Sequence, residues 1–179
     1  MIIKSISHTG NKKAARKLIK YIFDGRKSLE DPDGKKLIFK QHLRGYDKDK
    51  WAKQFEDLEA NRKSHYGNKS VVAYHEVVSF SDKSTQYLSR SIIKDLIGRY
   101  IKMRTNGQML CAGAVHFEKG NKNWHAHLVF SGIKTTDFKS ARISKTKLAD
   151  IKTQLQQYQI EKYPQLEDSI VRHGLKKKN

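Results

Sequence analysis

Three shortages in this sequence each exclude a class of protein. The 179 residues include one cysteine and two prolines. A single cysteine, Cys111, cannot build an internal disulfide framework or a cysteine-rich zinc finger, and its place in the apolar run MLCAGAV favours a buried, inert thiol. So few prolines, together with 9% aromatic residues, argue against a disordered polycation. No apolar run is long enough to span a membrane.

Acidic residues are also few beside basic ones. The chain has 37 Lys and Arg residues against 18 Asp and Glu residues, which gives a formal net charge of +19. This surplus implies a polyanionic partner, because clustered cations repel one another unless phosphates or counterions neutralise them. Nucleic acid is the usual partner. An anionic membrane is the weaker alternative, since no predicted helix combines a basic face with a bulky apolar face.

The two ends of the chain bear on localisation and domain organisation. The N-terminal segment MIIKSISHTGNKK lacks the apolar stretch of about 7–15 residues that marks a secretory signal. We therefore expect a cytoplasmic protein. The sequence has no internal repeat and no linker before its last residues, so we expect one domain over residues 1–170. Residues 171–179, with three consecutive lysines, are expected to form a basic tail or a truncated linker.

Hydrophobic periodicity predicts the element order βαβαβαββα. The expected strands are residues 2–7, 37–43, 71–80, 109–117 and 124–132. The expected helices are residues 11–23, 48–66, 84–104 and 144–163. This order favours an α+β fold with a single domain, in which helices flank a central antiparallel sheet of about five strands.

Three histidines fall on the hairpin predicted from the last two strands. His125 and His127 lie two residues apart, so both side chains point to the same face of their strand. His116 ends the preceding strand, and an antiparallel hairpin can bring it opposite the pair. Three imidazoles on one face form the ligand set of an open metal site. Imidazole ligands suit Zn, Mn, Co or Ni.

The simpler interpretation of the His-x-His pair is two ordinary polar residues on a half-exposed strand. His116 and Glu118 favour the metal site, because buried neutral histidines without partners are costly. His75 lies in the middle of another predicted strand, and two interpretations of it stay open. It either joins the metal site or supports one of the ligands, or it is a core histidine with satisfied hydrogen bonds.

The ordered motif resembles the signature of HUH endonucleases, and more specifically that of conjugative relaxases of the MobA/VirD2-like group. It reads His116-Phe-Glu118, then KGNKNW, then His125-Ala-His127-Leu-Val-Phe. The segment KKAARKLIKYIFDG resembles the one that presents the family's catalytic tyrosine, which gives that role to Tyr21. The stretches QHLRG, WAKQFEDLEANRK, YHEVVSFS, RISKTKLADIK and YPQLEDSIVRHG extend the likeness over nearly the whole chain. Glu118 departs from the family's usual Asp, and the loop before His-x-His is longer than usual.

The resemblance implies a metal-dependent DNA relaxase, that is, a tyrosine transesterase. Such an enzyme nicks and rejoins one DNA strand at the transfer origin of a plasmid or mobile element, through a 5′-phosphotyrosyl intermediate on Tyr21. The histidine triad would bind Mn²⁺ or Mg²⁺, and Zn²⁺, Co²⁺ or Ni²⁺ would also fit. Glu118 would either remove the phenol proton or, as we favour, orient a ligand histidine through its second nitrogen.

The expected partners are single-stranded DNA with a hairpin at the transfer origin and accessory relaxosome proteins, with no membrane insertion. The basic residues expected to contact DNA are Lys12, Lys13, Arg16, Lys17, Lys20, Arg26 and Arg44.

Two other functions fit the same sequence. Rolling-circle replication proteins and single-tyrosine transposases place the nucleophile on a helix after His-x-His, where Tyr158 stands here. Alternatively, the chain is a non-catalytic nucleic-acid-binding module with structural histidines and with Trp51 or Trp124 stacking on bases. Binding by such a module would fall with salt and would not respond to a chelator.

Overall fold

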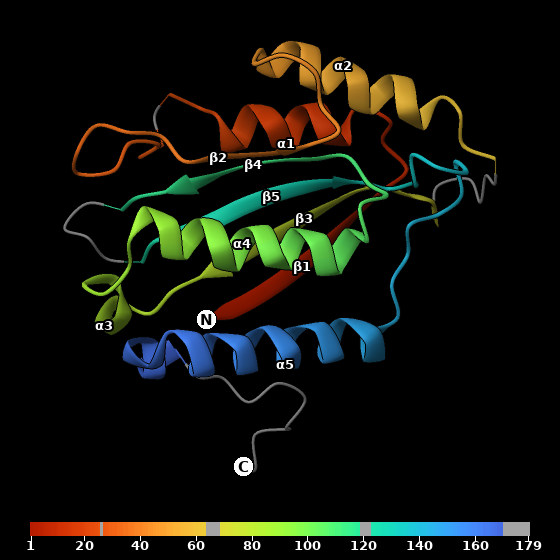
Figure 1. Cartoon of the computed structure of the whole chain (residues 1–179). Coiled ribbons are helices and arrows are strands. Elements are labelled where there is room, and N and C mark those ends of the chain that lie inside the picture. Colours follow the sequence, from red (N-terminus) through yellow and green to blue (C-terminus); the bar gives the residue numbers. More distant parts are fainter. Residues whose placement is uncertain (26, 64–68, 119–122, 170–179) are drawn as a thin grey trace, which may run out of the picture.

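An antiparallel sheet of five strands forms the centre of the protein in the computed structural model (Figure 1). The structure describes residues 1–25, 27–63, 69–118 and 123–169. The strands are β1 (Ile2–Thr9), β2 (Ile38–Gln41), β3 (Val71–Ser79), β4 (Cys111–His116) and β5 (His125–Ser131). They lie in the order β1-β3-β5-β4-β2, and every neighbouring pair is antiparallel. The sequence therefore predicted the fold class correctly.

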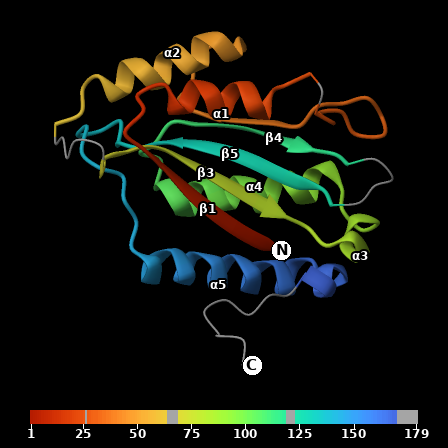
Figure 2. The same ribbon diagram turned by 180° about the vertical axis from the view of Figure 1, so that it is seen from behind.

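Helices cover both faces of the sheet, as Figures 1 and 2 show. One layer contains α1 (Ala14–Ile22) and α2 (Lys48–Glu59), and the other contains α4 (Arg90–Thr105) and α5 (Lys145–Lys162). Two short helices, α3 (Asp82–Thr85) and η2 (Pro164–Ser169), complete the described elements. Each layer encloses its own apolar core against the sheet. No described helix has the length and apolar character needed to cross a bilayer.

Polar side chains fix where several helices begin. The Asp47 carboxylate accepts hydrogen bonds from the first backbone amides of α2, and the hydroxyls of Ser89 and Ser144 do the same for α4 and α5. Helix α1 has no such side-chain cap. It is held instead by a buried stripe of Ala14, Ala15, Leu18, Ile19 and Ile22. Lys20 and Tyr21 lie between these buried residues and are exposed, so their side chains face away from the core.

One predicted helix is two separate helices in the structure. The helix predicted over residues 84–104 is two helices, because α3 ends at Thr85 and α4 begins at Arg90. Ser81 caps the first and Ser89 caps the second, so two start signals lie where apolar periodicity indicates one helix. Cys111 is fully buried, and burial raises the pKa of its thiol well above the usual range, as expected for an inert thiol. The predicted tail at 171–179 lies outside the described residues.

A buried charge network joins the sheet to α4. The Glu76 carboxylate on β3 is fully buried and accepts hydrogen bonds from Arg104 Nε at 3.0 Å and from Ser5 Oγ at 2.7 Å. The Tyr100 hydroxyl donates a third hydrogen bond to it. Burial and the neighbouring Glu76 charge raise the pKa of Tyr100 well above its usual value. Strand β1, strand β3 and helix α4 are thus connected through one carboxylate.

Candidate active site

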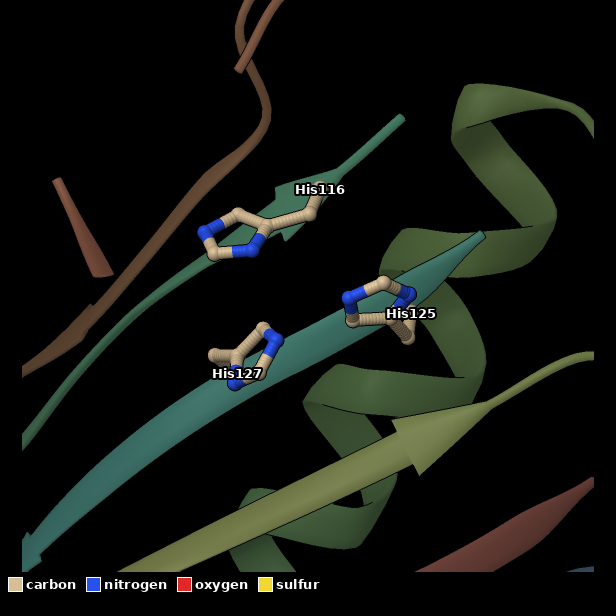
Figure 3. Close-up of side chains that lie close together, drawn as sticks. All are labelled: His116, His125 and His127. Carbon is tan, nitrogen blue, oxygen red and sulfur yellow. The ribbon is translucent and has the colours of Figure 1, made fainter. Parts of the chain in front are cut away.

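Strand register brings the three histidines of the hairpin together. His116 on β4 lies opposite His125 on β5, and His127 follows two residues later on the same face. One ring nitrogen from each lies within 4.8 Å of the others. Figure 3 shows the rings gathered over the neighbouring ends of the two strands. The face is the one that α1 packs against.

Hydrogen bonds hold one nitrogen of each imidazole. The Ile22 carbonyl at the end of α1 accepts from His116 Nε2 at 2.8 Å, and the Asn123 carbonyl accepts from His125 Nδ1. His127 Nδ1 lies 2.9 Å from His75 Nε2. A nitrogen that donates to a carbonyl carries the proton, so the other nitrogen of a neutral ring keeps its lone pair. His116 and His125 therefore present a lone pair each.

The third ring completes a set of donors that fits a metal ion. His127 Nε2 is buried and has no hydrogen-bond partner among the residues that the structure describes. Burial, with smaller contributions from the neighbouring His116 and His125, lowers the pKa of His127 to about 3. Burial also lowers the pKa of His116. Neutral imidazoles with free lone pairs are the form that ligates a divalent ion, and three of them leave coordination positions open.

Tyr21 lies beside this cluster. It occupies the last turn of α1, and 44% of its surface is exposed. Its ring centroid is 5.7 Å from that of His127 and 6.5 Å from that of His116. The Lys27 ammonium lies 4.3 Å from the centroid of the tyrosine ring. An accessible phenol, a lysine cation and three metal-competent imidazoles therefore share one side of the sheet.

Comparison with known proteins gives the family of the chain. Residues 21–162 match the nuclease domain of MobA/VirD2-like relaxases. The chain belongs to this family. The fold of this relaxase domain is similar to that of the conjugative relaxase TrwC, solved in a metal-bound complex with oriT DNA, with 14% identity and a TM-score of 0.57 over 93% of this chain and 70% of that one.

A second solved relaxase has the same fold. The MobM relaxase domain, solved with a 26-nucleotide pMV158 oriT DNA, has 12% identity and a TM-score of 0.58, and the match covers 100% of this chain and 97% of that one. Comparison with curated protein sequences gives no match. At these identities the solved structures support the α+β relaxase fold.

His75 contacts the histidine cluster of the relaxase from behind. Its Nε2 lies within hydrogen-bond distance of His127 Nδ1. For His127 Nε2 to present a lone pair, Nδ1 must carry the proton and donate a hydrogen bond to His75 Nε2. Burial lowers the pKa of His75, which keeps this acceptor neutral. Three groups, the carbonyls of Ile22 and Asn123 and the His75 ring, thus orient the cluster.

Glu118 has a different position from the one we favoured. Its Oε1 lies 4.0 Å from His125 Nε2, which is the nitrogen facing the cluster, and its side chain is 52% exposed. Among the residues that the structure describes, Glu118 forms no hydrogen bond to the three histidines, whose other nitrogens are held by other groups. The nitrogens that we expected Glu118 to orient are thus held by the Ile22 and Asn123 carbonyls and by His75. No residue type in the sequence indicates that the carbonyls of Ile22 and Asn123 would hold His116 and His125, because every residue has a backbone carbonyl.

Most of the basic residues expected to contact DNA are open to solvent. Exposed side chains are found at Lys12, Lys13, Lys17, Lys20 and Arg44. Arg16 differs, because its guanidinium forms a two-pronged ion pair with Glu56 on α2 at 2.6 and 3.1 Å. It therefore offers less charge to a phosphate than the sequence indicates. Arg26 lies outside the described residues. Lys27, which the sequence did not single out, takes the position beside Tyr21.

The residues of the two alternative functions lie elsewhere. The Tyr158 hydroxyl donates to Asp95 at 2.7 Å, and its ring packs with the α4–α5 core on the far side of the sheet from the histidines. Trp51 and Trp124 are 2% and 8% exposed, so neither ring projects from the protein surface as a stacking platform, which the binding-module hypothesis required. Of Tyr21 and Tyr158, Tyr21 is the one beside the histidine cluster.

Metal-free protein should lose stability as the pH falls from 7.5 to 5. The pKa of His127 is about 3 in the folded protein and about 6.5 in an unfolded chain, so unfolding takes up a proton in this range. Protons bound by the unfolded state favour unfolding, and His127 alone should cost about 2 kcal/mol at pH 5. Urea unfolding in EDTA at both pH values measures this. The loss should shrink by that amount in His127→Gln, and an equal loss in both proteins would contradict the assignment.

Proposed function

We propose that this relaxase domain nicks and rejoins single-stranded DNA at a transfer origin through a covalent bond to Tyr21. One observation supports this most directly. The Tyr21 ring lies 5.7 Å from the His127 ring, whose buried Nε2 has no partner within the described structure. A nucleophile and a metal-competent nitrogen set are thus placed to act on the same phosphate.

His116, His125 and His127 would hold a divalent ion, for which we propose Mn²⁺ or Mg²⁺. When bound, such an ion neutralises charge on the non-bridging phosphate oxygens as the phosphodiester is attacked. The TrwC complex, which shares this fold, is a metal-bound structure. His75 and the carbonyls of Ile22 and Asn123 keep the three rings in the required tautomers.

The reaction exchanges one phosphoester bond for another. Tyr21 Oη forms a bond to phosphorus while the bond from phosphorus to the 3′ oxygen breaks. The phenol gives up its proton and the departing 3′ oxygen gains one, so the products are a 5′-phosphotyrosyl link and a free 3′-OH. Because the number of phosphoester bonds is conserved, a 3′-OH can later attack the link and reseal the strand.

The surrounding charges support this step. The Lys27 ammonium beside the Tyr21 ring places positive charge where the phosphate would lie. Glu118 stands half exposed at the rim of the cluster, and we propose it as the acceptor of the phenol proton, since other groups already orient the histidines. Phosphates on either side would meet the exposed basic side chains of α1, such as Lys17 and Lys20.

We further propose that the substrate is the single strand beside a hairpin at the origin, bound in the cytoplasm with accessory relaxosome proteins. TrwC and MobM were each solved with oriT DNA, which supports this class of partner. The net charge of +19 supports a polyanion.

Covalent trapping tests the proposed function and its metal requirement. With Mn²⁺ and a pool of labelled single-stranded DNA containing hairpin-flanked members, we expect an SDS-resistant protein–DNA adduct. EDTA should abolish it, and His125→Ala should lower its yield at least about 100-fold, because one of three ligands is lost. His42→Asn is the matched control, since His42 is an exposed histidine outside the cluster whose φ of 57° asparagine accepts.

Two outcomes would contradict the proposal. An adduct that forms equally well in EDTA would exclude the metal requirement. DNA binding that falls with salt, ignores the chelator and gives no adduct would favour the non-catalytic binding module.

A further inference from the structure

A pocket of about 280 Å³ lies beside the histidine cluster and has no role in the chemistry described above. Its apolar wall is formed by residues from β2, α2 and β4 and from the segment after α1, namely Phe23, Leu29, Ile38, Trp51 and Ala114. The same strand, β4, carries His116 at its end. The pocket therefore opens on the face of the sheet that holds the site.

Covalent neighbours and strand register join the pocket to the active site. Phe23 follows Ile22, whose carbonyl holds His116, and stands two residues after Tyr21. Ala114 lies directly opposite His127 in the β4–β5 register. The chain and the β4–β5 register thus place lining residues of the pocket next to residues of the active site.

The walls of the pocket are flat and aromatic. The rings of Phe23 and Trp51 meet edge to face with centroids 5.6 Å apart. The Trp51 indole donates a hydrogen bond to the Gly45 carbonyl at 3.0 Å, which fixes the orientation of the ring. Ile38 is 43% exposed although it lies in a strand. The pocket thus has an apolar wall in which one aromatic ring is held in place by a hydrogen bond.

The rim of the pocket is aromatic and cationic. Tyr46 is 88% exposed, and the Lys40 ammonium lies 4.0 Å from the centroid of its ring. Lys36 and Lys48 also line the pocket, and both are exposed. Apolar walls with lysines at the mouth suit a ligand that has a flat uncharged part and an anionic part.

We propose that this pocket binds a nucleobase of the DNA strand next to the scissile phosphate, with the lysines at the rim contacting the adjoining phosphates. This inference rests on the proposed function, because it takes the strand at Tyr21 as the ligand. A single-stranded nucleotide fits each feature: the base enters the apolar pocket, and the backbone meets the cations and continues to the histidine cluster. The pocket is then a subsite for one base, and the identity of that base would help to determine where the strand is nicked.

Photo-cross-linking tests the pocket separately from the nicking reaction. A short oligothymidylate that contains 4-thiothymidine is mixed with the protein in EDTA, irradiated and mapped by peptide mass spectrometry. We expect cross-links at Phe23 or Tyr46. Because the measurement needs neither metal nor cleavage, its result stands even if nicking fails.

Two variants with matched chemistry make the test quantitative. Tyr46→Ala should weaken binding of the same oligonucleotide by about 5- to 150-fold, the range for loss of one stacked base. Tyr87→Ala, at a tyrosine that is 49% exposed outside the pocket, should leave binding unchanged. Equal effects of the two variants, or cross-links that map only outside the pocket, would overturn the subsite, even for a protein that forms the Tyr21 adduct.

Discussion

Tyr21→Phe should abolish the covalent DNA adduct and lower nicking by at least about 1,000-fold, because it removes the oxygen that becomes bonded to phosphorus. The variant should fold normally. Tyr21 is 44% exposed, and a phenylalanine ring keeps its contacts with Lys27 and His127. Adduct yield on a denaturing gel, with thermal unfolding of the same preparation, measures both effects.

Tyr158→Phe is the matched control for this prediction. It removes a hydroxyl that donates to Asp95, and so should cost about 1 kcal/mol of stability without affecting the adduct. The opposite pattern, with an adduct retained in Tyr21→Phe and lost in Tyr158→Phe, would favour a replication-type nuclease. An adduct lost in neither would mean that another residue is the nucleophile.

Glu76→Ala should lower the free energy of unfolding by about 3–5 kcal/mol. The substitution leaves the Arg104 guanidinium buried without its counter-charge, and it also removes the acceptor for Tyr100 and Ser5. Within the described part of the chain, Arg104 already has one buried nitrogen, Nη2, without a partner, so its remaining contacts cannot compensate. Urea unfolding at neutral pH measures the loss.

Ser5→Ala gives the scale for this second prediction. It removes one hydrogen bond from the same carboxylate but leaves the ion pair with Arg104 intact, and should cost only about 1 kcal/mol. If Glu76→Ala cost no more than Ser5→Ala, the network would not be a main source of stability. The part of the Glu76→Ala protein that remains folded should still form the Tyr21 adduct, because the network lies on the other face of the sheet.

Alternation and register explain how much of the site could be predicted from the sequence. Residues two apart in a strand share a face, which places His125 beside His127 from spacing alone. A hairpin then brings His116 opposite, and the structure has this pairing. The five strands follow from runs of apolar and β-branched residues, and all five are present. These features depend on local periodicity, which a single sequence displays.

What the sequence did not show depends on contacts between distant segments. Backbone carbonyls hold His116 and His125, and a carbonyl is present at every residue, so no residue type marks these two. Arg16 is neutralised by Glu56, 40 positions away, because α1 packs on α2. Glu118 is a carboxylate, the kind of side chain that often orients a histidine. In this structure the Ile22 and Asn123 carbonyls and the His75 ring hold the histidines instead. Tyr21 was assigned through the resemblance, since periodicity alone shows only a tyrosine on a helix.

Strand β3 assigns two adjacent residues to two separate tasks. His75 faces the nitrogen cluster, and the next residue, Glu76, faces the charge network under α4. Adjacent residues of this strand face opposite sides of the sheet, so substitutions at His75 and at Glu76 should have different effects. In a saturation library, substitutions of His75 should give folded protein with a disturbed histidine cluster, whereas substitutions of Glu76 should give little folded protein. A directed-evolution experiment for thermostability can accordingly vary residues on the Glu76 face of β3 without changing the residues that contact the histidine cluster.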